Sequence, residues 1–323
     1  MNYSIIGKHR RELMGISMIL IVIYHTSIYL PETLYRFKAL TDIGVSMFFF
    51  LSGYAMLYSW DKNPDAKAFI IKRLKRIFMT TLPVVFVWCL PQVIIGRIGI
   101  GEFVAKCMSI YYWYNGNLLY WFISAIVMLY LLTPWFITLY RKNRKATMTV
   151  IGILYVVIVV AGRNGFMNHI IQFSYRFIIY FIGMICAVAA KEEKKIPRSV
   201  WIISAILFIV PVVLMLIFKD AVYSAGFRYV AETMMTAFLI IAITLILEKI
   251  RIDMKISKML GDYTLEMYLF HEKVLYIFTF IYFKIGIQFD RFGIVTNVLS
   301  VLVAFGISII YKKIIGMVLQ KCS

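Results

Sequence analysis

The stretch Leu13-Met14-Gly15-Ile16-Ser17-Met18-Ile19-Leu20-Ile21-Val22-Ile23-Tyr24-His25 decides how this chain folds. Up to its last residue the run is suited to lipid, and with the residues that follow it is long enough to begin a membrane-spanning helix. The imidazole of His25 must face a partner, a cavity or water, because an unpaired polar group costs several kcal/mol in hydrocarbon. An ionisable side chain inside a span is therefore a candidate functional residue.

The composition of the whole chain agrees with this interpretation. Of its 323 residues 62% are hydrophobic and 16% charged, and the mean hydropathy is +0.83. These values predict an all-α, polytopic membrane protein with one domain over residues 1–323. The four cysteines have no disulfide or metal-ligand spacing, so we expect no metal and no permanently bound cofactor. The first apolar run lacks a cleavage site and predicts a retained signal anchor.

Apolar runs predict about ten transmembrane helices. They cover residues 13–30, 41–60, 77–95, 118–139, 148–162, 173–190, 200–218, 230–248, 260–283 and 292–311. With this count, 24 of the 35 Lys and Arg lie in the termini and loops of one side. That bias predicts both termini in the cytoplasm and a multi-pass protein of the plasma membrane. The basic charge then reflects topology, which argues against a nucleic-acid partner.

Three elements near the N-terminus suit chemistry on a phosphate-bearing donor. A neutral His25 can act as a general base, although a histidine that only packs between helices explains it equally well. Arg73 and Arg76 share one helical face, with Lys72 beside them, and can bind phosphates; the positive-inside rule explains the same residues.

Ser52 and Gly53 follow a phenylalanine run near the end of the second span. Small residues there allow the close approach of either another helix or a ligand chain.

The order and spacing of these elements resemble the acyltransferase-3 family of integral membrane acyltransferases. The similar segments are His25, Ile43-Gly44-Val45, Phe48-Phe49-Phe50-Leu51-Ser52-Gly53-Tyr54, Arg73-Leu74-Lys75-Arg76, Tyr120-Trp121-Phe122, Arg176-Phe177-Ile178-Ile179-Tyr180-Phe181-Ile182-Gly183 and Thr264-Leu265-Glu266-Met267-Tyr268-Leu269-Phe270-His271. The resemblance covers nearly the whole chain.

The resemblance implies transfer of an acyl group, most often acetyl, from cytoplasmic acyl-CoA to a hydroxyl of an envelope sugar or polysaccharide. It implies that His25 is the catalytic base and that Arg73 and Arg76, with Lys72, Ser52 and Gly53, bind the donor. Acetyl-CoA is then a substrate, the acceptor is a saccharide, and proteins of polysaccharide assembly are candidate partners beside the lipid bilayer. Both direct transfer and an acyl-histidine relay are compatible with the sequence.

One position departs from the family pattern. The family has an arginine eleven residues before the histidine, where this chain has Met14. Arg11 lies fourteen residues before His25 and falls about 40° from the same helical face. Arg11 is therefore the expected substitute, as a second catalytic residue that stabilises the oxyanion.

Five further polar or aromatic residues are expected to bind the acceptor or support the site. They are Glu266, His271, Tyr120, Trp121 and Arg176. A structural hydrogen bond for His271, an interfacial aromatic belt for Tyr120 and Trp121, and an ion pair for Arg176 are the alternatives. Glu272 and Lys273 are expected to face the bundle interior and pair with other helices.

A competing function is a transporter or flippase for a saccharide or lipid-linked intermediate, which would also use intramembrane His, Glu and Lys. Against it, the prolines show no pairing between corresponding helices of two repeated halves.

Overall fold

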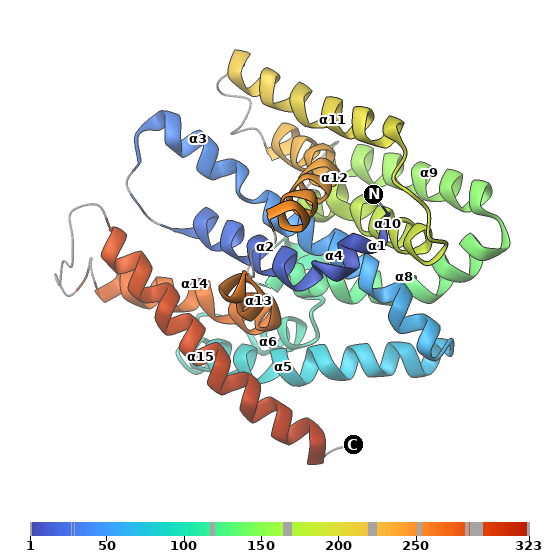
Figure 1. Cartoon of the computed structure of the whole chain (residues 1–323). Helices are drawn as coiled ribbons and strands as arrows, with labels where there is room; N and C mark the ends of the chain where they lie inside the picture. Colours follow the sequence, from blue (N-terminus) through green and yellow to red (C-terminus); the bar gives the residue numbers. More distant parts are fainter. Residues whose placement is uncertain are drawn as a thin grey trace. The chain divides into compact units, whose positions relative to one another are not determined.

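The computed structural model describes residues 2–26, 28, 30–116, 120–163, 170–218, 225–250, 254–281, 284 and 293–321. Within these ranges the named elements are all α-helices, and an isolated bridge joins Asn2 and Lys195. The helices, drawn in Figure 1, are α1 (Ser4–Lys8), α2 (Arg10–His25), α3 (Glu32–Leu40), α4 (Ile43–Lys62), α5 (Ala66–Ile94), α6 (Ile100–Cys107), α7 (Tyr111–Asn115), α8 (Trp121–Lys142), α9 (Arg144–Arg163), α10 (Ile171–Lys191), α11 (Arg198–Ile217), α12 (Ala225–Ile250), α13 (Lys255–Asp262), α14 (Thr264–Phe280) and α15 (Ile294–Lys321).

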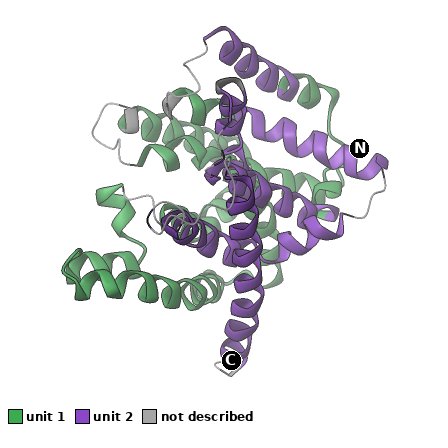
Figure 2. Ribbon diagram, turned by 90° about the vertical axis from the view of Figure 1, so that its left-hand side faces the viewer, with its two compact units in different colours: residues 1–7, 49–203, 224–233 green, residues 8–48, 204–223, 234–323 purple. Residues whose placement is uncertain are grey.

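The helices form two compact units, coloured separately in Figure 2. Unit 1 contains Met1–Gly7, Phe49–Ile203 and Ser224–Thr233. Unit 2 contains Lys8–Phe48, Ser204–Tyr223 and Met234–Ser323. Both units combine segments that are distant in sequence.

Eight helical segments of the described chain are long and apolar enough to cross a membrane. They are Leu34–Lys62, Ala66–Ile94, Trp121–Lys142, Arg144–Ala161, Ile171–Lys191, Arg198–Ile217, Phe227–Ile250 and Ile294–Gln320. Each matches one of the predicted spans. The all-α, polytopic fold is thereby confirmed.

The other two predicted spans, 13–30 and 260–283, correspond to shorter helices. Helix α2 has 16 residues and α14 has 17, so they measure about 24 Å and 26 Å against a hydrocarbon core of about 30 Å. The expected end of the first span at residue 30 is wrong, because α2 stops at His25. Thr26, in an extended conformation (ψ 145°), is the C-cap of α2. Pro31 is the N-cap of the next helix, α3.

Glycines set the packing inside unit 1. A Cβ added at Gly53 would lie 2.0 Å from the carbonyl oxygen of Tyr180, and one at Gly183 would lie 2.1 Å from that of Phe50. Only glycine permits such contact at both places, so α4 and α10 touch backbone to backbone.

The same device joins α2 to α13 in unit 2. A Cβ at Gly15 would lie 1.8 Å from the carbonyl oxygen of Ser257, and one at Gly261 would lie 2.0 Å from that of Arg11. The Ser257 hydroxyl also donates to the Glu12 carbonyl oxygen at 2.8 Å. Because Gly15 faces Ser257 and Arg11 faces Gly261, α13 runs antiparallel to α2.

After α13 the chain turns at Tyr263, and α14 returns along α2, with which it is in contact. This turn brings the end of α2 to the middle of α14.

Ion pairs join the basic segments of unit 1. Asp61 accepts hydrogen bonds from Arg141 and Lys191, and Glu192 accepts them from Arg144 and Lys194. The two cations lower the pKa of Glu192 to about 2. The segments 61–76, 140–147 and 191–199, which charge counting assigned to one side, therefore meet in space.

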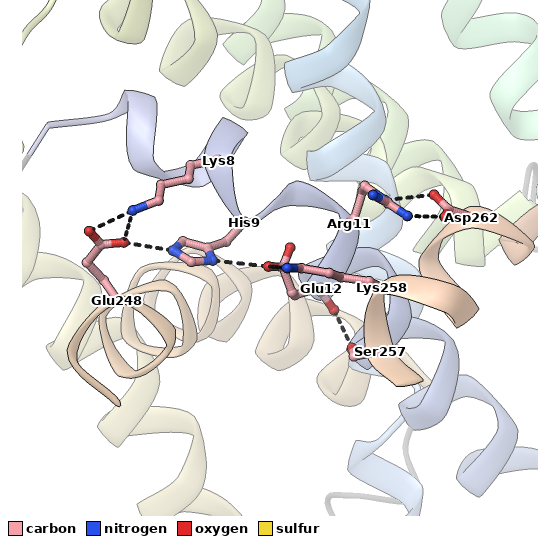
Figure 3. A network of polar contacts seen from close by, with 8 residues as sticks. All are labelled: Lys8, His9, Arg11, Glu12, Glu248, Ser257, Lys258 and Asp262. Carbon is pink, nitrogen blue, oxygen red and sulfur yellow. Dashed lines mark hydrogen bonds and ion pairs between the residues drawn. The ribbon is translucent and has the colours of Figure 1, made fainter. Parts of the chain in front are cut away.

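A second network joins the basic segments of unit 2 (Figure 3). The Lys8 ammonium and His9 Nε2 both contact Glu248, at 2.7 Å and 2.8 Å. On the other side of the same ring, Nδ1 of His9 lies 3.4 Å from Glu12, which also faces Lys258 at 3.5 Å. These contacts hold the start of α2 against α12 and α13.

Candidate active site

His25 is the last residue of α2. Its side chain is 30% exposed, and it stands at the end of the helix where the backbone dipole favours a positive charge. An imidazolium formed there would be stabilised by the helix end. The position therefore suits a side chain that takes up a proton during a reaction.

A carboxylate of α14 holds the imidazole. Nδ1 of His25 lies 2.9 Å from Oε1 of Glu272, whose side chain is 36% exposed. When Nδ1–H donates to this carboxylate, the lone pair of Nε2 is left to accept a proton. An imidazole base that a carboxylate orients in this way is a common arrangement for activating a hydroxyl.

His271, the neighbour of Glu272, completes a small cluster. Its ring centroid is 5.1 Å from that of His25, and its side chain is buried, with 5% exposure. Nδ1 of His271 faces the carbonyl oxygens of Met267 and Tyr268 at 2.9 Å and 3.0 Å. Nε2 is buried and has no hydrogen-bond partner among the described residues.

Arg11 does not join this cluster. Its guanidinium makes two hydrogen bonds to the carboxylate of Asp262. Fourteen residues of helix separate Arg11 from His25, which is about 21 Å, and no arginine side chain covers that distance. The geometry therefore argues against an oxyanion contact by Arg11 and assigns it to the junction of α2 with α13.

The basic residues predicted to bind the donor lie in unit 1, in the first part of α5. This helix begins at Ala66, capped by Asp65, so Lys72, Arg73 and Arg76 are helical as expected. The Arg73 guanidinium donates to the Ser59 hydroxyl. The side chains of Lys72 and Arg76 are exposed and make no hydrogen bond or ion pair with any described residue.

The small pair Ser52-Gly53 takes the helix-packing alternative. Gly53 lies against the backbone of Tyr180, which leaves no room for a ligand chain on that face. Ser52 is buried, with 8% exposure. Donor binding by this pair is therefore not favoured by the structure.

The expected acceptor residues of unit 1 are buried in its interior. Arg176 and Glu232 form an ion pair at 2.5 Å with both side chains fully buried, and the guanidinium stacks on Tyr229 at 4.4 Å. Trp121 packs beside it, 5.5 Å from the guanidinium. Arg176 thus takes the ion-pair alternative, and Trp121 is a core residue rather than part of an exposed belt.

Tyr120 is also buried, with 5% exposure. It lines a cavity with room for about one water molecule, together with Lys106, Ser109, Tyr111, Tyr112 and Ser124. This volume is far below that of a saccharide site. Glu266, the remaining candidate, is buried in the first turn of α14.

Glu272 was not predicted as the partner of His25. The signal was present, because a carboxylate next to an intramembrane histidine needs a partner of its own. Glu272 was expected to pair with another helix, and the structure identifies that partner as His25 of α2.

Eight apolar helices in the described part of the chain define a multi-pass membrane protein, and the His25–Glu272 pair has a geometry suited to proton transfer. A family model described as an acyltransferase domain matches residues 13–312. The chain belongs to this family, acyltransferase-3, and is an acyltransferase. Neither the curated proteins nor the solved structures include a match. Membership of an enzyme family decides against the transporter alternative.

Proposed function

We propose that this protein is an O-acyltransferase of the plasma membrane, which moves an acetyl group from cytoplasmic acetyl-CoA to a hydroxyl of an envelope sugar or polysaccharide. The observation that carries the proposal is the 2.9 Å contact between Nδ1 of His25 and Glu272. It gives one imidazole the tautomer and orientation that a general base requires.

The reaction uses Nε2 of His25. This nitrogen takes the proton of the acceptor hydroxyl while the hydroxyl oxygen attacks the thioester carbonyl carbon. The tetrahedral intermediate then expels the CoA thiolate as the carbon–sulfur bond breaks. The His25 imidazolium returns its proton to the sulfur, and Glu272 and the end of α2 stabilise the imidazolium meanwhile.

His271 binds the acceptor. Its Nδ1–H is committed to backbone carbonyls, so its buried Nε2 offers only a lone pair. A second hydroxyl of the acceptor can donate to Nε2 of His271 while Nε2 of His25 takes the proton of the reacting hydroxyl. Polyhydroxylated acceptors supply such a second hydroxyl, which supports a saccharide.

Lys72 and Arg76 bind the phosphates of the donor. Their exposed charges, without partners among the described residues, are the free cations that diphosphate recognition requires. Arg73 joins α5 to the end of α4 through its hydrogen bond to Ser59. This contact fixes the α5 face that carries Arg73 and Arg76. The distribution of Lys and Arg puts this face and both termini on the same side, so the proposed cytoplasmic donor site places the termini in the cytoplasm as well.

Acyl transfer with the purified protein in nanodiscs tests this proposal. We expect His25→Ala to lower turnover by about 10²–10⁴-fold, the contribution of a general base. Arg76→Ala should raise the KM for acetyl-CoA with a smaller change in kcat. His9→Gln, a change to a histidine of the other network, is the matched control and should leave turnover unchanged. Normal turnover in His25→Ala would refute the mechanism.

The acceptor is identified separately. Mass spectrometry of envelope glycans from cells with and without the gene should show a shift of one acyl unit on one polysaccharide. Identical glycans in both strains would refute the envelope acceptor while leaving the enzyme class intact.

A further inference from the structure

The cluster at the end of α2 has the composition of a metal site. One ligand atom from each of His25, His271 and Glu272 lies within 4.8 Å of the other two. Two imidazole nitrogens and one carboxylate oxygen, with a fourth position open, are a ligand set that Zn²⁺ takes in proteins. The sequence gives no spacing motif, because two of the residues are adjacent and the third is on another helix.

His271 is already oriented as a ligand. Its Nδ1–H faces the carbonyl oxygens of Met267 and Tyr268, which is the outer contact that metal-bound histidines make in proteins. This contact directs the lone pair of Nε2 into the cluster. That atom is buried and unpartnered within the part of the chain that the structure describes, so a cation there would satisfy it.

The distances can close onto one ion. Zn–ligand bonds of about 2.0–2.1 Å place the ligand atoms of a tetrahedral site about 3.4 Å apart. The present limit of 4.8 Å requires a movement of about 1.4 Å at most. His25 and Glu272 are 30% and 36% exposed and can rotate toward the buried His271.

The charge of the site limits its affinity. Glu272 is the one anionic ligand of the three, and the buried cation Lys273 follows it in the helix. A divalent ion would leave a net positive charge. The site therefore suits an ion that binds and leaves, in contrast to a resident structural metal.

We propose that Nδ1 of His25, Nε2 of His271 and the Glu272 carboxylate bind one Zn²⁺ reversibly, and that the bound ion inhibits acyl transfer because it leaves the ring proton of His25 on Nε2, which then has no lone pair to act as a base. The second part rests on the function proposed above. The first part, binding, is independent of it.

The second histidine network of unit 2 provides an internal control. His9 also lies between two carboxylates, but Glu12 contacts Nδ1 and Glu248 contacts Nε2. These nitrogens are on opposite sides of the ring, as Figure 3 shows, so the two carboxylates cannot converge on one ion. Lys8 and Lys258 occupy the same carboxylates.

Binding is measured on the full-length purified protein with Co²⁺, whose visible absorption reports tetrahedral coordination, and with Zn²⁺ as competitor. We expect one ion per chain. His271→Gln should weaken binding at least about tenfold, and His9→Gln should have no effect. His25→Gln, at a half-buried helix end, is the second ligand variant should His271→Gln fail to fold. Equal affinity in the ligand variants, or the absence of any binding, would overturn the inference.

Inhibition is measured by adding Zn²⁺ to the acyl-transfer assay and then removing it with EDTA. We expect reversible inhibition of the wild type, at a Zn²⁺ concentration that His9→Gln leaves unchanged. Failure of the two proposals can be told apart. An inactive His25→Ala with no Zn²⁺ bound by the wild type would remove the metal site alone. If the wild type binds Zn²⁺ and His25→Ala keeps full activity, the metal site stands and the proposed catalytic role of His25 is refuted.

Discussion

Replacing Gly15 by alanine tests whether helix contact in unit 2 positions the active site. The new Cβ would lie 1.8 Å from the carbonyl oxygen of Ser257, whereas ordinary contact begins at 3.4 Å. The difference between these distances means that α13 must move away from α2 by about 1.6 Å.

This movement has a cost that can be estimated. Overpacking a tight contact destabilises by about 1–3 kcal/mol. The hydrogen bond from Ser257 to the Glu12 carbonyl would stretch from 2.8 Å beyond bonding distance, which costs about 1 kcal/mol more. Alanine returns about 1 kcal/mol through its higher helix propensity. We expect a net loss of about 1–3 kcal/mol.

The same movement should lower activity. Helix α13 continues through Tyr263 into α14, so its displacement is passed to Glu272. A misplacement of about 1 Å in a catalytic group can cost about a hundredfold in rate. The measurements are thermal unfolding in detergent and acyl-transfer rate.

Gly306→Ala is the matched control. A Cβ there meets nothing within 4 Å, so this variant should keep its activity and unfold at the same or a higher temperature. Equal unfolding temperatures and rates for Gly15→Ala and Gly306→Ala would show that the α2–α13 contact does not position the site.

Three more outcomes are expected. Arg11→Gln should lower turnover less than tenfold, because its ion pair with Asp262 is exposed and screened by solvent; a loss beyond a thousandfold would indicate a direct contact with the reaction at His25. Glu232→Ala should destabilise the protein by about 3–5 kcal/mol in denaturant unfolding, because it leaves the Arg176 charge buried, and a loss below 1 kcal/mol would contradict this. Glu192→Gln should destabilise slightly above about pH 4.3, where the unfolded carboxylate is ionised. This difference from the wild type should fade as pH falls toward the folded pKa of about 2; a difference that grows in acid would reverse the sign of the argument.

Most of the fold could be predicted from the sequence, because hydrophobic length alone determines a membrane span. Eight of the predicted spans are helices of sufficient length and apolarity. The exact end of α2 could not be predicted, since the apolar residues Ile28 and Leu30 follow His25 in the sequence, whereas the helix ends at the extended backbone of Thr26. The two exceptions, α2 and α14, carry His25, His271 and Glu272.

The site was predictable in kind but only partly in detail. His25 was evident because an imidazole among apolar residues has few explanations. Its partner Glu272 was not, because that contact depends on how α14 folds back along α2. At Gly53 the sequence allowed the close approach of either another helix or a ligand chain, and in the structure the backbone of Tyr180 lies there. Arg11 lies close to the helical face of His25, which favoured a shared role. The distance between them along the helix axis excludes a contact with the reaction.

The turn at Tyr263 makes the site sensitive to chain length. Between Gly261, fixed against the Arg11 backbone, and Glu272 the chain has few residues, and most are helical. Inserting a single residue there would rotate the Glu272 carboxylate by about 100° around the α14 axis and aim it away from His25. We therefore expect this stretch to tolerate substitutions. An insertion is expected to be tolerated only together with a deletion that restores the helical phase of Glu272.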